Sequence, residues 1–194
     1  MKSLPRMVLA ALFTGLMVAG ALITIPFPQV PLVIANAFPW LAALVLGPLW
    51  AAVSTILYLL LGLFGLPVFA KGAAGVGVFL GPTGGFLVGY LLSALVVGGL
   101  RDPAGKNVVR NAVAVAAGLV SVYLAGIPWL AFVVFHGPAG WEPSHFIQAL
   151  LWATGPAAAP FLFVVGDVIK AVAVVAVGAV LTRLPGVAPL LKNR

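Results

Sequence analysis

The sequence contains no cysteine and only three acidic residues, and each shortage excludes a class of protein. Without cysteine, the chain forms no disulfide, no thiolate metal site and no thiol nucleophile. Charged residues make up only 7% of the chain and hydrophobic residues 63%, whereas a soluble domain carries roughly 25% charged residues. So little polar surface cannot cover a folded particle in water. The composition therefore indicates a protein of the lipid bilayer.

Motifs for several kinds of chemistry are also missing. The glycine-rich stretch at residues 69–85 lacks the Gly-Lys-Ser/Thr ending of a phosphate-binding loop, so we expect no ATP site. The spacing of His136, Glu142 and His145 matches no standard zinc pattern, and no Ser–His–acid arrangement can be drawn. We therefore expect no metal site, no cofactor and no enzyme activity. The net charge is +7, but the positive residues form no stripe, which argues against nucleic acid as a partner.

What the sequence does contain is a series of apolar runs that approach the length of a membrane-spanning helix, about 20 residues. The runs lie at residues 7–25, 32–46, 48–63, 82–100, 108–134 and 159–182, and residues 144–153 form a candidate short helix between the last two. No domain boundary or internal repeat divides the chain. The sequence predicts an all-α integral membrane protein in which residues 1–194 form one six-helix bundle.

The positive residues give this bundle an orientation, because cytoplasmic loops are enriched in lysine and arginine. If the N-terminus lies inside, the inner segments hold most of the ten positive residues, namely Lys2, Arg6, Arg101, Lys106, Arg110, Arg183, Lys192 and Arg194. An even number of spans then places the C-terminus inside as well. We expect a multi-pass protein of the cytoplasmic membrane with both termini in the cytoplasm.

Small residues recur at every fourth position in two of the predicted spans. The first ladder is Ala11, Gly15 and Ala19, and the second is Gly81, Gly85 and Gly89. Such spacing puts the small residues on one helix face and lets two backbones approach closely. Each ladder packs either against another helix of the bundle or against a second membrane subunit, and both possibilities stay open.

The last apolar run contains two charges, Asp167 and Lys170, which lie on one helix face because residues at i and i+3 are neighbours. A charge that faces lipid costs at least about 2.5 kcal/mol, so both side chains are expected to face the bundle interior or a cavity. Three interpretations follow. The pair locks helix packing, or it forms a polar floor for a small, mostly apolar anion with hydrogen-bond donors, or Asp167 relays protons.

Other polar groups fall at membrane depth or beside it. Asn36, Tyr90 and Tyr123 lie in predicted spans, where each either bonds another helix or lines a site. Lys71 lies in the glycine-rich outer stretch, where it either draws in an anion or stays solvated. The glycines around it allow a compact loop that approaches a ligand closely.

Three motifs together are similar to the signatures of one transporter family. They are GLPVFA at residues 65–70, GAAGVGVFLGPTGGFLVGY at 72–90 and GDVIKA at 166–171. Over nearly its whole length, the chain resembles the BioY family, the biotin-specific substrate-binding component of energy-coupling-factor transporters. Lys71 stands where the resemblance leads us to expect a small or neutral residue.

The resemblance implies a prokaryotic six-helix protein that binds biotin near its outer face and reorients in the membrane as partner subunits hydrolyse ATP. It points to Asp167 and Lys170 as ligand-binding residues. The full set of candidates is Asp167, Lys170, Tyr90, Tyr123, Asn36, Gly84, Gly85 and Lys71. The implied partners, besides membrane lipid, are a transmembrane coupling protein and two cytoplasmic ATPase subunits. In this family, the ladder of Ala11, Gly15 and Ala19 is expected to meet the coupling protein.

Three rival functions fit the same residues. The first is a stand-alone permease that moves biotin or another small anionic vitamin with protons through Asp167. The second is the same scaffold with a site for a different vitamin. The third is a membrane scaffold that transports nothing, which would tolerate the loss of both Asp167 and Lys170.

Overall fold

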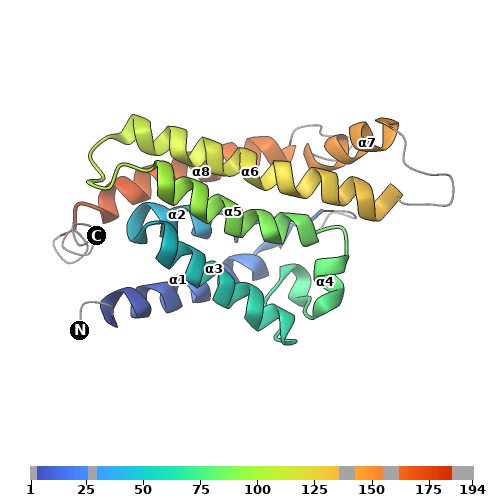
Figure 1. Ribbon diagram of the computed structural model, residues 1–194, viewed down its shortest axis with the longest axis horizontal. Helices are drawn as coiled ribbons and strands as arrows, with labels where there is room; N and C mark the ends of the chain where they lie inside the picture. Colours follow the sequence, from blue (N-terminus) through green and yellow to red (C-terminus); the bar gives the residue numbers. More distant parts are fainter. Residues whose placement is uncertain (1–3, 26–29, 136–142, 155–161, 185–194) are drawn as a thin grey trace.

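The computed structural model describes residues 4–25, 30–135, 143–154 and 162–184 (Figure 1). In this part of the chain the helices are α1 (Leu4–Leu22), α2 (Ala37–Leu46), α3 (Pro48–Leu63), α4 (Val76–Leu80), α5 (Gly84–Leu100), α6 (Val108–Phe135), α7 (Pro143–Thr154) and α8 (Leu162–Leu181). A 3-10 turn, η1 (Ala70–Gly72), precedes α4. Strands β1 (Thr24–Ile25) and β2 (Leu32–Val33) pair antiparallel.

The longer helices run along a common direction, whereas α4 and α7 lie at one end of the bundle (Figure 1). Helix α1 begins and α8 ends at the opposite end, which also carries the turn between α5 and α6 (Figure 1). Helix α5 packs most extensively on α6, and α2 lies between α5 and α8. The described loops at the end with α4 and α7, within residues 30–36 and 69–73, lie beside the first turns of α5 and α8.

Three described helices are long and apolar enough to cross a membrane, namely α1, α6 over Val108–Val134, and α8. Helices α2, α3 and α5 are apolar but shorter, with 10, 16 and 17 residues. At about 1.5 Å per residue, α2 covers roughly half of the hydrocarbon thickness of a bilayer. The mostly helical, membrane-type fold is thus confirmed, whereas the count of six crossings stays a prediction.

The predicted runs differ from the helices chiefly at the first connection. Helix α1 ends at Leu22 instead of reaching residue 25, and α2 begins at Ala37 instead of residue 32. Between these helices, Thr24 pairs with Val33 and Ile25 pairs with Leu32. The antiparallel pairing takes the place of helical hydrogen bonds at the end of the first predicted run and at the start of the second.

The two small-residue ladders have different surroundings. A side chain at Gly85 would place its Cβ 2.3 Å from the Cβ of Trp129, and one at Gly89 would lie 2.9 Å from the Cα of Val122. The prediction of a three-residue ladder on one helix is wrong at Gly81, which is the C-cap of α4 and precedes α5. Gly85 and Gly89 lie on α5 and pack inside the chain against α6. The ladder on α1 is exposed throughout, and a Cβ at Gly15 would meet nothing within 4 Å. That face of α1 is uncovered in the described part of the chain.

Candidate ligand-binding site

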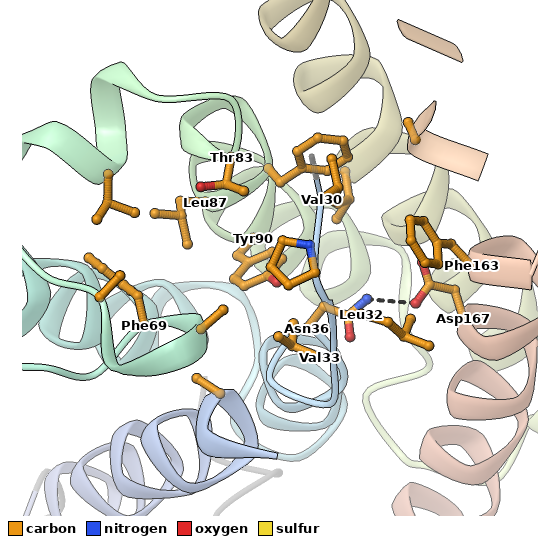
Figure 2. Close-up of a pocket in the computed structure, with 18 of the residues that line it drawn as sticks. Val30, Leu32, Val33, Asn36, Phe69, Thr83, Leu87, Tyr90, Phe163 and Asp167 are labelled. Atoms are coloured by element: carbon orange, nitrogen blue, oxygen red, sulfur yellow. Dashed lines mark hydrogen bonds between the residues drawn. The ribbon is translucent and has the colours of Figure 1, made fainter. Parts of the chain in front are cut away.

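A cavity of about 240 Å³ lies where these loops meet the first turns of α5 and α8. Its walls are mostly apolar, and they include Phe69 beside η1, Phe86 and Leu87 on α5, and Phe163 on α8 (Figure 2). The segment from Val30 to Asn36, which contains β2, forms one side. The cavity is thus built from residues far apart in the chain.

A hydrogen-bonded network of polar side chains lines one part of the cavity. The Asp167 carboxylate accepts hydrogen bonds from the Asn36 amide, at 2.9 Å, and from the Tyr123 hydroxyl, at 2.8 Å. Figure 2 shows the first of these bonds. Lys170 forms an ion pair with Asp167 and donates to the side-chain oxygen of Asn36 and to the carbonyl of Val33, both at 2.9 Å. The network joins α8 to α6 and to the start of α2.

Counting donors and acceptors shows what this network leaves for a ligand. A lysine ammonium has three N–H donors, and Asp167, Asn36 and Val33 accept all three. An ionised carboxylate has about four acceptor positions, of which three are used at Asp167. One acceptor position of Asp167 and one amide N–H of Asn36 therefore have no partner among the described residues.

Asp167 and Lys170 form the ion pair that the first interpretation predicted. The side chains are 8% and 14% exposed, respectively, so the pair is largely desolvated. However, both residues line the cavity and are not sealed between two packed helices. A carboxylate with an unused acceptor position next to a cavity is arranged to receive an N–H donor.

Two helix N-cap positions direct their side chains to the cavity rather than to their own helices. Asn36 is the N-cap of α2 and Thr83 is the N-cap of α5, yet neither makes a capping hydrogen bond. Asparagine and threonine at this position usually accept from the first turn of the helix. Here Asn36 bonds to α8 and Thr83 lines the cavity (Figure 2).

Most of the predicted ligand residues come together in this one place. The cavity lining includes Asp167, Lys170, Tyr90, Tyr123, Asn36 and Lys71. Lys71 belongs to η1 and is the one non-glycine residue with a positive φ among the described residues, at 60°. This left-handed conformation is uncommon outside glycine and holds the lysine in the loop beside the cavity.

Gly84 and Gly85 are not part of the lining. A Cβ at Gly84 would lie 1.8 Å from the carbonyl oxygen of Phe79, and one at Gly85 would press on Trp129. The Trp129 indole also donates to the carbonyl of Gly81, at 2.9 Å. These two glycines allow the start of α5 to pack closely against α4 and α6, which positions Thr83 at the cavity.

Sequence reasoning missed several lining residues. Tyr58 is 1% exposed and meets the Phe69 ring edge-on, at 5.4 Å between centroids. Phe69 in turn fits beside Gly62, where a Cβ would lie 2.1 Å from its ring. The sequence held one signal for Tyr58, a tyrosine within an apolar run, but no local pattern identified Phe69 or Thr83. His136 and Glu142 lie outside the described residues, as do Lys2, Lys192 and Arg194.

Comparison with known proteins shows the family. A sequence model of the BioY family matches residues 1–186. The chain belongs to the BioY family. The resemblance carried by the three sequence motifs is thereby confirmed.

Individual members of the BioY family are similar in sequence to this chain over long stretches. The biotin transporter BioY of Rhizobium etli is 34% identical over 191 residues, which cover 92% of this chain and 94% of that protein. The biotin transporter BioY of Thermotoga maritima is 40% identical over 129 residues, covering 66% of this chain and 76% of the relative. A crystal structure of the S-component for biotin from an ECF-type ABC transporter has a TM-score of 0.79 and 25% identity, covering 98% of this chain and 97% of that chain.

Proposed function

We propose that this BioY chain is the substrate-binding component of an ECF-type transporter and takes up biotin across a prokaryotic cytoplasmic membrane. The observation that carries the proposal is the cavity, in which apolar walls meet a polar network centred on Asp167. Biotin has a compact, mostly apolar fused ring, a ureido group with two N–H donors and one acceptor, and a carboxylate tail. The relatives described as biotin transporters support the same ligand. The activity is transport, with biotin as cargo and no covalent step.

The unused hydrogen-bonding positions suggest how the ligand lies. A ureido N–H donates to the remaining acceptor position of Asp167, and the ureido oxygen accepts the remaining N–H of Asn36. Lys170 keeps its three protein acceptors and balances the charge of Asp167. The carboxylate tail then points to Lys71, the other cation in the lining. Tyr90 and Tyr123 flank the ring.

We further infer that residues 1–194 form one unit that crosses the membrane at α1, α2, α3, α5, α6 and α8. Helix α2 is short, but the segment from Val30 to Asn36 extends it and lines the cavity. Non-helical backbone at membrane depth is tolerated where it lines a cavity.

We propose an orientation for the chain as well. The end of the bundle where α1 begins and α8 ends also carries Arg101, Lys106, Arg110 and Arg183. Lysine and arginine favour the cytoplasmic side. We therefore place both termini in the cytoplasm and the cavity near the outer face.

The proposal includes the partners of the ECF module. The exposed ladder of Ala11, Gly15 and Ala19 offers a face on which a transmembrane coupling protein packs closely. That protein connects the chain to two cytoplasmic ATPase subunits, which supply the energy for reorientation.

Uptake of labelled biotin by a host that lacks its own biotin uptake tests this function. We expect uptake when the chain is produced with its coupling and ATPase subunits, and we expect loss of uptake when ATP is depleted. The rival proton-coupled permease predicts the opposite pattern. In that case, the chain alone transports biotin or another small anionic vitamin, a protonophore stops transport, and ATP depletion has no effect.

A further inference from the structure

A second hollow, of about 300 Å³, opens on the side of the bundle between α6, α7 and α8. Its walls include Val120, Leu124 and Ile127 of α6, Leu150 of α7 and Val164 of α8. We call this hollow the lateral groove. All of its lining side chains are apolar except Tyr123, whose hydroxyl is directed to Asp167. The lateral groove therefore offers no partner to a polar ligand.

The position of the lateral groove indicates which apolar molecule reaches it. Two of its three walls, α6 and α8, are helices long and apolar enough to cross a membrane. Its rim continues into the exposed apolar surface of α6, where Val120 is 55% exposed and Leu124 is 70% exposed. This surface faces hydrocarbon when the protein is in a bilayer. We propose that the lateral groove binds one acyl chain of a membrane phospholipid.

One side chain connects the lateral groove with the ligand cavity. The Tyr123 ring lines both hollows, and its hydroxyl donates to Asp167 at 2.8 Å. On the cavity side, the ring meets Phe86 edge-on, at 6.4 Å between centroids. An acyl chain packed on the groove side restricts the ring to the position that keeps the bond to Asp167.

Bound lipid is therefore expected to strengthen biotin binding, and bound biotin to strengthen lipid retention by the same factor. This coupling rests on the proposed function, whereas the acyl-chain site does not. Typical couplings between sites correspond to at least about a fivefold change in affinity.

Two matched variants test the proposal. Val120→Trp places an indole in the lateral groove, and Val113→Trp places one on the same face of α6, two turns away. Val113 is 61% exposed, close to the value for Val120, and does not line the lateral groove. Native mass spectrometry without biotin then counts palmitoyl-oleoyl phosphatidylglycerol molecules retained after delipidation. We expect the wild type and Val113→Trp to keep one lipid and Val120→Trp to lose it.

Calorimetry with biotin, with and without added lipid, tests the coupling. We expect lipid to raise the biotin affinity of the wild type and Val113→Trp about fivefold, and to leave Val120→Trp unchanged. Equal lipid retention by both variants would overturn the acyl-chain site. An unchanged affinity in the lipid-loaded wild type would overturn the coupling. If no variant binds biotin while lipid retention still differs, the proposed function fails and the acyl-chain site stands.

A measurement on the wild type covers the case in which Val120→Trp does not fold. A phospholipid with a diazirine in its acyl chain is photo-crosslinked to the protein, and the labelled residues are mapped by mass spectrometry. We expect more label at Leu150 and Val164 than at Val172, which is 66% exposed on α8 and outside the lateral groove. Label that simply follows exposure would overturn the proposal.

Discussion

Replacing Asp167 with asparagine separates the two roles of the buried ion pair. The substitution preserves shape but removes the negative charge, so Lys170 becomes an uncompensated cation that is only 14% exposed. Removal of one partner from a buried pair typically costs about 3–5 kcal/mol. Because Lys170 keeps its bonds to Asn36 and Val33, we expect a loss at the lower end, about 3 kcal/mol in free energy of unfolding.

The double variant Asp167→Asn/Lys170→Met removes the stranded charge as well. If the pair contributes little net stability once both charges are gone, about 2–3 kcal/mol of the loss caused by Asp167→Asn is recovered. Biotin binding is not recovered, because an asparagine amide has two acceptor positions where the carboxylate has about four. The Asn36 amide and the Tyr123 hydroxyl occupy both of them, so none is left for the ureido N–H. Denaturation in detergent micelles measures the first quantity and calorimetry the second. Undiminished biotin binding by the double variant would refute the reasoning and favour a pair that only locks the helices.

Four further predictions concern other parts of the chain. Lys71→Met weakens biotin binding at least tenfold, because the variant loses the cation that pairs with the carboxylate. Biotin methyl ester has no carboxylate, so we expect calorimetry to give it the same affinity for the variant and for the wild type. Gly85→Ala lowers the free energy of unfolding by about 1–3 kcal/mol through overpacking, whereas Gly99→Ala on the same helix, where a Cβ meets nothing, raises it by about 0.5–1 kcal/mol. Gly15→Leu leaves biotin affinity intact but abolishes ATP-driven uptake by blocking the docking face; normal uptake would contradict this assignment. The pKa of the Asp102 carboxyl is held below its usual value, chiefly because the carboxylate accepts a hydrogen bond from the backbone N–H of Asn107. This stabilisation is present at pH values above the pKa of Asp102 in the unfolded chain, and it is lost as the pH falls through the lower pKa of the folded protein. Asp102→Asn therefore lowers the unfolding temperature at pH 7, and the difference from wild type shrinks only below about pH 3.9.

The helices were largely predictable because hydrocarbon imposes a strong constraint on composition. Helix α3 has the predicted bounds and α6 begins at the predicted residue. The pairing of β1 with β2 and the five-residue helix α4 were missed, since elements this short depend on tertiary contacts more than on local pattern. The sequence also held no information on which small-residue ladder is covered.

The site was predictable in its centre but not in its surroundings. The spacing of Asp167 and Lys170 placed both on one face of α8, and the structure has them paired. The bond from Asn36 to Asp167 joins residues 131 positions apart, and no local pattern predicts such a contact. Gly84 and Gly85 were expected at the ligand, yet the glycines serve backbone packing at the start of α5. Glycine serves both purposes, so the sequence alone does not distinguish a glycine that approaches a ligand from one that lets two helices pack closely.

Native mass spectrometry of the chain purified from cells grown with biotin tests the biotin site most directly. We predict one biotin per chain for the wild type and none for Asp167→Asn under the same conditions. Biotin retained equally by both, or a different small molecule in the wild type, would contradict a biotin site at Asp167.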